Sequence, residues 1–455
     1  MGRVSEDEVS VMTHDAEPTG GRRGASAPAR RHPPKTRRPT PAPVVASPAI
    51  TALEARIAEL RAHPDGVHTP QTLVDAFRAE HASSPIIEPD PAGVPGLRVV
   101  TFALHDAAAE RVLLFVNRLT DETDLDRSLM RRVPDTDLWH LSYRMPDDWI
   151  ASYSYSVQRP GHLAPWERQP DQRGVRDALD HGLADPRNPS QITNRAGVRI
   201  SVAALPHAPA EPWRAVRDGV PQGRLTAHAG PDGRRLWIYE PAAGDHGAVA
   251  PAPTPVLVVL DGDVWCDAQP LPTILDNMIA DAAIPPVTAV FVDSADRERR
   301  WAELDAHGGI VDWLADRLRP WLVARLGGAI DLAPRRVVVA GQSLGGLAAL
   351  AAVVRRPDAF GGAIAQSAAL WQPDVAREAA ACPPRGARID LQVGLQEWVL
   401  LEPTRDLAAQ LADDGVDVVL TEVDGGHDYA WWRRTLPTAL RRQLAEPQDA
   451  EADPA

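Results

Sequence analysis

A serine between two glycines is the residue best placed to do chemistry. Residues 336–350 read Arg-Val-Val-Val-Ala-Gly-Gln-Ser-Leu-Gly-Gly-Leu-Ala-Ala-Leu, which is a buried-strand pattern running through Gly-x-Ser-x-Gly into a helix of small residues. A strand that turns at once into a helix holds its serine in a strained conformation with the hydroxyl exposed. Glycine at 341 and 345 avoids a collision on either flank of this turn. The pattern predicts that Ser343 is a nucleophile.

A nucleophilic serine needs a base, and the sequence offers one histidine downstream of Ser343. It is His427, in the stretch Val-Asp-Gly-Gly-His-Asp-Tyr, which follows the strand-like residues 416–421. Hydrolases with this serine motif place their triad in the chain order Ser, acid, His. We therefore expect His427 to be the general base.

The acid of such a triad must lie between the serine and the histidine, on a loop after a strand. Residues 389–393 read as that strand, and Glu397 lies in the loop that follows. Glu402 and Asp406 fall on the next predicted helix. Asp424 and Asp428 are too close to His427 in sequence to reach behind its ring, and are interpreted as turn-forming or substrate-side carboxylates. Glu397 is the predicted acid.

Two backbone N–H groups are candidates for an oxyanion hole. The first is that of Leu344, the residue after the nucleophile. The second is in Leu260-Asp-Gly-Asp-Val-Trp265, which leaves a strand early in the same region. There Gly262 would let the backbone approach a substrate, and the N–H of Asp263 is the predicted donor. The alternative is an ordinary Asp-Gly turn.

The elements around these residues predict two different folds along the chain. Apolar runs at 236–239, 256–260, 287–292, 337–340 and 363–366 alternate with helical stretches at 270–280, 310–326 and 344–355. This alternation predicts an α/β-hydrolase fold, a mostly parallel sheet with helices on both faces. Period-two patterns at 97–104, 111–117, 138–144 and 152–157 predict an all-β immunoglobulin-like sandwich before it.

The predicted domain boundaries follow the changes in composition. They are a disordered Arg-, Pro- and Ala-rich extension at 1–48, short packing helices at 49–84, the β-sandwich at 85–213, a linker at 214–233, the catalytic domain at 234–446 and an acidic tail at 447–455.

The charge balance excludes some classes of partner. A formal net charge of -14 argues against nucleic acid and anionic membrane surfaces. No apolar run approaches the length of a membrane-spanning helix, and the two cysteines, Cys266 and Cys382, are too few for a disulfide framework. Pairs of adjacent arginines in residues 1–48 could suggest an export signal, but the apolar segment that a signal peptide needs is missing, so we expect a cytoplasmic protein. The oligomeric state is left open between monomer and dimer.

The combined motifs resemble the enterochelin (enterobactin) esterase family over residues 85 to 445. The resemblance is carried by Asn117–Asp121, Asp185–Pro189, Leu260–Trp265, Asp293–Asp296, Arg300–Leu304, Gly341–Leu347, Gln366–Ser367, Trp371, Asp424–Asp428 and Trp432–Arg433. It implies an esterase-D-like hydrolase domain behind the sandwich, which hydrolyses the trilactone of a ferric catecholate siderophore and releases iron inside the cell. No cofactor is implied, because the iron enters as part of the substrate.

A ferric tris-catecholate is anionic and aromatic, so we expect a locally cationic and aromatic site. The predicted substrate-binding residues are Arg300, Arg299, Trp265, Trp371 and Trp432. Their alternative roles are surface ion pairs for the arginines and core packing for the tryptophans. Two other functions stay open: another esterase or acyl transferase of the same superfamily, and a siderophore-binding protein without catalysis.

Overall fold

The catalytic part of the chain is built on one sheet of eight strands. The computed structural model describes residues 34, 42–169, 171–243 and 252–445, so most of the predicted extension and the predicted tail lie outside the described residues. The strand order is β16-β15-β14-β13-β11-β12-β10-β9, and β11 to β16 run parallel. The bounds are β9 Arg224–Ala229, β10 Arg235–Glu240, β11 Val256–Val259, β12 Thr288–Val292, β13 Val337–Gln342, β14 Gly362–Gln366, β15 Arg388–Gly394 and β16 Asp417–Val423.

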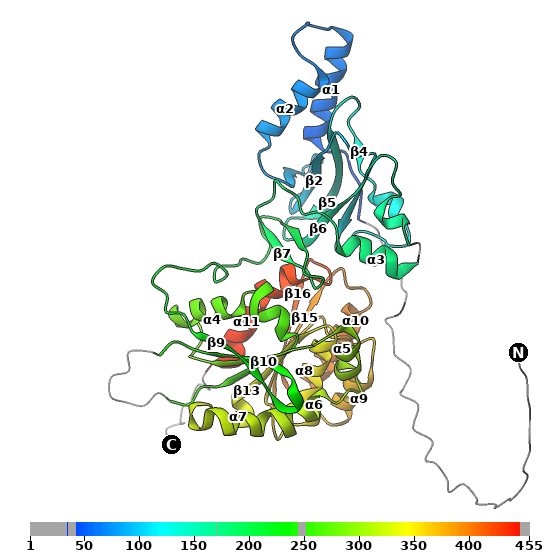
Figure 1. Cartoon of the computed structure of the whole chain (residues 1–455). Coiled ribbons are helices and arrows are strands. Elements are labelled where there is room, and N and C mark those ends of the chain that lie inside the picture. Colours follow the sequence, from blue (N-terminus) through cyan, green and yellow to red (C-terminus); the bar gives the residue numbers. More distant parts are fainter. Residues whose placement is uncertain (1–33, 35–41, 170, 244–251, 446–455) are drawn as a thin grey trace, which may run out of the picture. The chain divides into compact units, whose positions relative to one another are not determined.

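Alternate residues of these strands enter two separate hydrophobic cores, as the two-residue period of a strand requires. Val258 and Val339 pack with one set of helices, whereas Val259 and Val338 pack with the other. The first set is α5 Arg297–Leu304, α6 Ile310–Trp313, α7 Arg319–Leu326, α8 Leu344–Arg355, α9 Asp374–Ala381 and α10 Leu401–Asp413. The second is α4 Leu271–Ala280 and α11 Tyr429–Leu444. Helices therefore cover both faces of the sheet (Figure 1).

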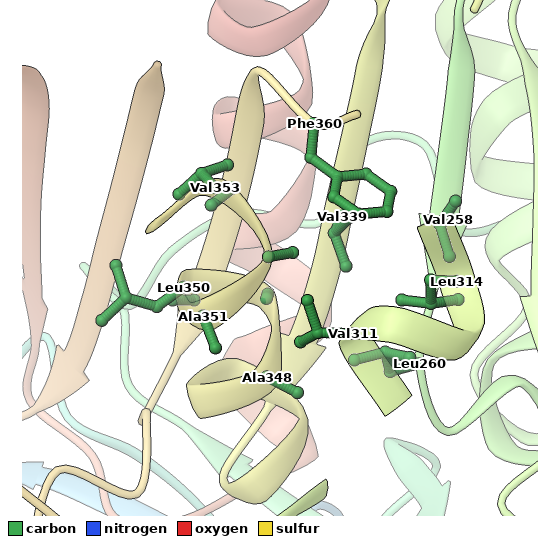
Figure 2. Close-up of a cluster of buried hydrophobic side chains, with 14 of the residues drawn as sticks. Val258, Leu260, Val311, Leu314, Val339, Ala348, Leu350, Ala351, Val353 and Phe360 are labelled. Carbon is green, nitrogen blue, oxygen red and sulfur yellow. The ribbon is translucent and has the colours of Figure 1, made fainter. Parts of the chain in front are cut away.

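The first core is centred on α8, the helix that follows Ser343. Figure 2 shows Val339 of β13 beside Phe360, with Ala348 and Ala351 of α8 close by. The first turns of α8 contain Gly345, Gly346, Ala348 and Ala349, and these small residues let the helix lie directly on the sheet. Close packing there fixes the start of the helix, and with it the turn that carries Ser343.

Two four-stranded sheets make up the region before the catalytic sheet. Their strand orders are β1-β2-β5-β4 and β3-β6-β8-β7, and their inner faces share one hydrophobic core. Helices α1 Pro48–Ala62 and α2 Pro70–Glu80 pack on the outer face of the first sheet, and α3 Gln172–Asp180 packs on the outer face of the second. The strands are β1 Ile86–Pro89, β2 Leu97–His105, β3 Arg111–Val116, β4 Arg131–Arg132, β5 Leu138–Pro146, β6 Ile150–Gln158, β7 Gln191–Thr193 and β8 Arg199–Ala204.

The structure differs from the sequence expectations at three places. Residues 42–48, predicted to be disordered, run beside β5, where Val45 N–H donates to the Ser142 carbonyl at 3.1 Å. Strand β9 lies in the predicted linker, and its alternation was hidden because it is an edge strand with mostly exposed or half-buried side chains. The predicted helix 310–326 contains a π-turn at Leu314–Leu318. No helix among the described residues is long and apolar enough to span a bilayer.

Phe360 tests the packing that holds α8. Its side chain is 1% exposed within the first core, so Phe360→Ala should lower the free energy of unfolding by about 3 to 5 kcal/mol, measured by urea unfolding with tryptophan fluorescence. Val323→Ala on α7 is the control, because Val323 is 55% exposed and should change the value by less than about 0.5 kcal/mol. A loss at Phe360 no larger than at Val323 would contradict this description of the core.

Candidate active site

Four neighbouring parallel strands end with polar residues at the same edge of the sheet. Ser343 follows β13, Ser367 follows β14, Glu397 lies three residues after β15, and His427 lies four residues after β16. In open sheets of this kind the carboxyl ends of the strands form the ligand-binding edge. The sequence expectation that Ser343, Glu397 and His427 follow strands of one sheet is therefore met by the topology.

Ser343 has a strained backbone between β13 and α8. Its φ is 60° and its ψ is -118°, in a region that non-glycine residues rarely adopt. A side chain at Gly341 would lie 2.3 Å from the Gly345 carbonyl, and one at Gly346 would lie 2.8 Å from the Gln366 carbonyl. A side chain at Gly345 itself would make only ordinary contacts, the nearest at 3.5 Å. The expected collision on both flanks is thus correct for Gly341, but the second constrained glycine is Gly346.

Glu397 and His427 form a short hydrogen bond. Glu397 Oε1 lies 2.5 Å from His427 Nδ1, and the carboxylate side chain is completely inaccessible to solvent. The other oxygen, Oε2, accepts from the Ser367 hydroxyl at 2.6 Å and from the Gly394 N–H at 2.8 Å. A carboxylate only accepts, so this bond places the imidazole hydrogen on Nδ1 and leaves Nε2 with its lone pair.

Trp432 lies against the imidazole rather than forming an open platform. Its ring meets that of His427 edge to face with centroids 4.8 Å apart, and its Nε1–H donates to the Ser367 hydroxyl at 2.8 Å. The side chain is 3% exposed. This geometry favours a role in orienting His427 over the predicted direct stacking on a substrate.

The loop that carries His427 is held by the N-terminal sheets. The Asn117 side-chain amide donates to the His427 carbonyl at 2.9 Å, and the Ser152 N–H donates to the Asp428 carboxylate at 2.6 Å. A side chain on Gly426 would lie 2.5 Å from the Asn117 amide oxygen, so glycine is required where the two segments meet. Asp428 also caps α11 by accepting from the Ala430 N–H at 2.9 Å.

The loop that carries Glu397 is hydrogen-bonded both to the histidine loop and to the N-terminal sheets. Gln396 donates to the Asp424 carboxylate at 2.6 Å and accepts from the Trp149 indole at 3.2 Å. The Ile150 N–H donates to the Asp424 carbonyl at 2.9 Å. Asp424 and Asp428 are therefore engaged in holding loops, in line with the turn-forming interpretation. The sequence showed no chemistry in the N-terminal sheets, yet residues from them hold the loops of both Glu397 and His427.

Three glutamines form a buried ladder beneath the candidate site. Gln342, Gln366 and Gln392 are direct neighbours on β13, β14 and β15, and all are at most 2% exposed. Gln342 donates to Gln366 at 2.9 Å, Gln366 donates to Gln392 at 2.6 Å, and the Trp265 indole donates to Gln342 at 2.7 Å. A satisfied network of this kind fixes the relative positions of the strand ends. Sequence reasoning missed it, although Gln-Ser after two consecutive strands was a visible signal.

The candidate oxyanion loop follows β11 and begins with Asp261 at φ 55°. A side chain on Gly262 would lie 2.4 Å from the Val292 N atom of β12. Glycine is thus needed there for packing against the neighbouring strand, and the expected approach of its backbone to a substrate stays a prediction. The Leu344 N–H lies in the first turn of α8, where the backbone N–H groups have no acceptor within the helix. The predicted donor Asp263 precedes the turn Val264–Ala268.

Asp261 is the electrostatic centre of this loop. Its carboxylate is fully buried and pairs with Arg300 through two bonds of 2.6 and 2.7 Å, while the Ser294 hydroxyl also donates to it. Burial alone would raise the pKa of Asp261, but the charges of Arg300 and Arg195 hold it well below its usual range. Arg300 also donates to the Gln342 carbonyl at 3.3 Å, next to Ser343. Because the charge of Arg300 is paired with the buried Asp261, a role in supporting the loop is favoured over the predicted contact with a substrate.

The other predicted binding residues lie at different depths. Arg299 is 42% exposed and pairs with Glu303 at 2.7 Å, as the surface ion-pair alternative expects. Trp265 is fully buried, so it is a core residue. Trp371 is half-buried and lies 6.1 Å from the ring of Trp301, between centroids. Among these tryptophans, Trp371 remains available for the predicted role in binding.

A further cation lies beside the acid loop. Arg118, at φ 60°, holds its guanidinium 5.5 Å from the centroid of the Trp398 ring. Burial lowers the pKa of Arg118, and the charge of Glu397 opposes that effect. Within the described ranges, no group of three or more His, Cys, Asp or Glu side chains is arranged to hold a metal.

Taken together, the described residues can support nucleophilic attack on a carbonyl carbon. The strained turn holds the half-buried Ser343 at the end of β13, and the imidazole is fixed by a buried carboxylate in the tautomer that can accept a proton. Two N–H groups at helix or turn starts are candidates for binding a developing negative charge.

Comparison with known proteins agrees with this arrangement in both parts of the chain. Residues 99–214 match the family described as "Enterochelin esterase, N-terminal", and residues 245–443 match the family described as "Putative esterase". The chain is 30% identical over 390 residues to the iron(III) salmochelin esterase of an Escherichia coli strain, an alignment that covers 80% of this chain and 92% of that protein.

Solved structures give the same result. The ferric enterobactin esterase of Salmonella typhimurium superposes with a TM-score of 0.69 at 26% identity, covering 81% of this chain and 98% of that one. The enterobactin esterase of Shigella flexneri, solved in the presence of enterobactin, gives a TM-score of 0.65 at 26% identity, with 77% and 94% coverage. The chain belongs to the enterochelin esterase family.

Proposed function

We propose that this protein is a serine esterase that hydrolyses the trilactone of a ferric catecholate siderophore. The observation that carries the proposal is the hydrogen bond between the buried Glu397 and the half-buried His427, 2.5 Å between Oε1 and Nδ1, at the sheet edge that also presents the strained Ser343. Membership of the family and the names of its relatives, which are esterases of iron(III) salmochelin and enterobactin, support the choice of substrate class.

In the proposed acylation step, the Ser343 oxygen attacks a lactone carbonyl carbon while His427 Nε2 accepts the hydroxyl proton. The negative charge that develops on the carbonyl oxygen is bound by the N–H groups of Leu344 and Asp263. The ester C–O bond then breaks, and the imidazolium returns its proton to the departing serine oxygen of the siderophore. The ring is now open and remains attached to Ser343 as an acyl-enzyme.

Deacylation repeats these steps with water as the nucleophile. His427 takes a proton from the water, the hydroxide adds to the acyl carbon, and the Ser343 oxygen leaves with that proton. One water is consumed for each ester bond. Glu397 holds the imidazole in one tautomer throughout and stabilises its charged form, and Ser367 and Trp432 keep Glu397 and His427 in place.

Iron takes part in the proposed reaction only as a component of the substrate. Hydrolysis of all the ester bonds weakens the hold on iron because three linked catecholates become separate ligands, which loses the advantage of high effective concentration. A reaction that frees iron for use belongs inside the cell, so a cytoplasmic location is part of the proposal. The proposed mechanism requires neither a metal cofactor nor a second subunit, so it applies to a monomer or a dimer.

Product analysis tests the substrate class directly. The protein should convert ferric enterobactin into linear products that are separable by HPLC, and cyclic, linear and glucosylated forms can be compared in the same assay. Another esterase of the superfamily would instead cleave p-nitrophenyl butyrate and leave the siderophore intact, and a binding protein would cleave neither.

Ser343→Ala should abolish hydrolysis while leaving the fold and siderophore binding nearly intact. Removing the nucleophile leaves only the residual rate from the oxyanion site and binding, so kcat should fall below about one hundredth of the wild-type value. HPLC of samples quenched at timed intervals gives kcat, and quenching of tryptophan fluorescence gives the Kd of the siderophore. A variant that keeps a larger share of the wild-type kcat would show that Ser343 is not the nucleophile.

Glu397→Gln should lower kcat by about a hundredfold or more with little change in KM, because an amide can hold the imidazole in the wrong tautomer without altering the pocket. Asp424→Asn and Glu402→Gln are matched controls, each removing one charge from a nearby carboxylate. If either control is more damaging to kcat than Glu397→Gln, the acid has been wrongly assigned.

A further inference from the structure

A turn of the N-terminal sheets reaches the candidate oxyanion loop. Residues 194–198 connect β7 to β8, and Asn194 braces the turn by accepting from the N–H groups of Ala196 and Val198, both at 3.0 Å. The start of the turn is fixed to the catalytic domain, because Gln269 donates to the Thr193 carbonyl at 2.9 Å. This turn is therefore a preorganised support, not a loose loop.

Arg195, at the tip of this turn, extends its guanidinium to Asp261. Its Nη2 lies 3.2 Å from Asp261 Oδ1, the same carboxylate that Arg300 holds through two shorter bonds. The Arg195 side chain is 37% exposed, whereas that of Arg300 is 10% exposed. One carboxylate is thus shared by two guanidinium groups, of which Arg195 is the more accessible to a bound molecule.

The contact with Asp261 uses a small part of the hydrogen-bonding capacity of Arg195. A guanidinium has five N–H donors in a rigid fork. Within the part of the chain that the structure describes, the single hydrogen bond of the Arg195 side chain is the one to Asp261. That bond restricts the orientations of the remaining donors, which lowers the entropy cost of binding an anionic oxygen.

The surroundings of Arg195 join the two sides of the candidate site. Its charge acts on Asp263, the predicted oxyanion donor, and on Tyr429, which follows His427 by two positions. Burial and the charge of Asp261 raise the pKa of Tyr429 to about 12, so its hydroxyl stays neutral. Burial and the charge of Asp261 raise the pKa of Asp263, whereas the positive charge of Arg195 acts to lower it.

We propose that Arg195 is a specificity-determining residue that donates hydrogen bonds to an anionic oxygen of the substrate bound beside the 261–263 loop. The inference rests on the proposed function and assigns to the N-terminal sheets the recognition role that the sequence predicted for Arg300. Asp261 then serves both arginines, since it locks Arg300 into the loop and aims Arg195 at the ligand.

One siderophore skeleton in two charge states tests this role. The ferric complex is anionic, whereas the iron-free form keeps its phenolic hydroxyls largely protonated near neutral pH. For the full-length protein, Arg195→Gln should lower kcat/KM for ferric enterobactin about 10- to 100-fold, mainly through KM. The loss should stay below about threefold for iron-free enterobactin and p-nitrophenyl butyrate, and the ferric deficit should shrink at high salt because exposed charges are screened.

Arg111→Gln is the matched control. Arg111 lies in the same sheets, is 38% exposed and pairs with one carboxylate, that of Glu167 at 2.7 Å, so its loss should leave all three substrates unchanged. Arg300→Gln should reduce turnover of all three together, because it loosens the loop itself. Arg195→Lys keeps the charge and should recover part of the ferric activity.

The outcomes are distinguishable. Equal losses of Arg195→Gln on all three substrates, at an unchanged melting temperature, would mean that Arg195 acts only through Asp261 on the loop, and the inference would be wrong. Wild-type activity of Arg195→Gln on the ferric complex would also overturn it while leaving the proposed function intact. If the wild-type protein cleaves p-nitrophenyl butyrate but neither form of the siderophore, the proposed function fails and the inference fails with it.

Discussion

The site depends on a carboxyl group that has no access to water. The Glu397 side chain is fully inaccessible, and a buried polar group is tolerated only when its oxygens are satisfied by donors. Those donors are Ser367, the Gly394 backbone and His427, which lie at or just after the ends of three neighbouring parallel strands. The hydrogen bonds to one carboxylate therefore link β14, β15 and β16 at their carboxyl ends, and the glutamine ladder links β13, β14 and β15 from within the sheet.

A second buried carboxylate links neighbouring segments by hydrogen bonds on the other side of Ser343. Asp261 gathers Arg300, Ser294 and Arg195 around the loop after β11, and Arg300 ties this loop to the backbone at the end of β13. The N-terminal sheets contact both sides, through Asn117 and Ser152 at the histidine loop and through Arg195 at Asp261. These contacts make the N-terminal sheets part of the candidate site as well as a neighbouring domain.

The sequence was sufficient to place residues whose position along the fold is set by local pattern. The strands after which Ser343, Glu397 and His427 lie, the helix that holds Glu402, and the α/β-hydrolase class all follow from periodicity and chain order, and the structure and the comparisons bear out the fold class. The sequence could not separate an exposed cation from a buried one. Arg299 and Arg300 are adjacent, yet one is a surface ion pair and the other is locked on Asp261, a difference that depends on which side of α5 faces the sheet. Long-range contacts such as those of Asn117 and Arg195 have no local signal, because they join segments more than 60 positions apart.

The most direct measurement of the central claim is a titration of Ser343 with a fluorophosphonate, which phosphonylates a serine activated by a neighbouring base. The fraction of the Ser343 peptide that carries the label is measured by mass spectrometry, and ferric enterobactin hydrolysis is measured by HPLC on the same samples. Activity should fall in proportion to labelling and reach zero when Ser343 is fully modified. Full labelling of Ser343 with siderophore hydrolysis still at its original rate, or loss of hydrolysis through a label on another residue, would contradict that claim.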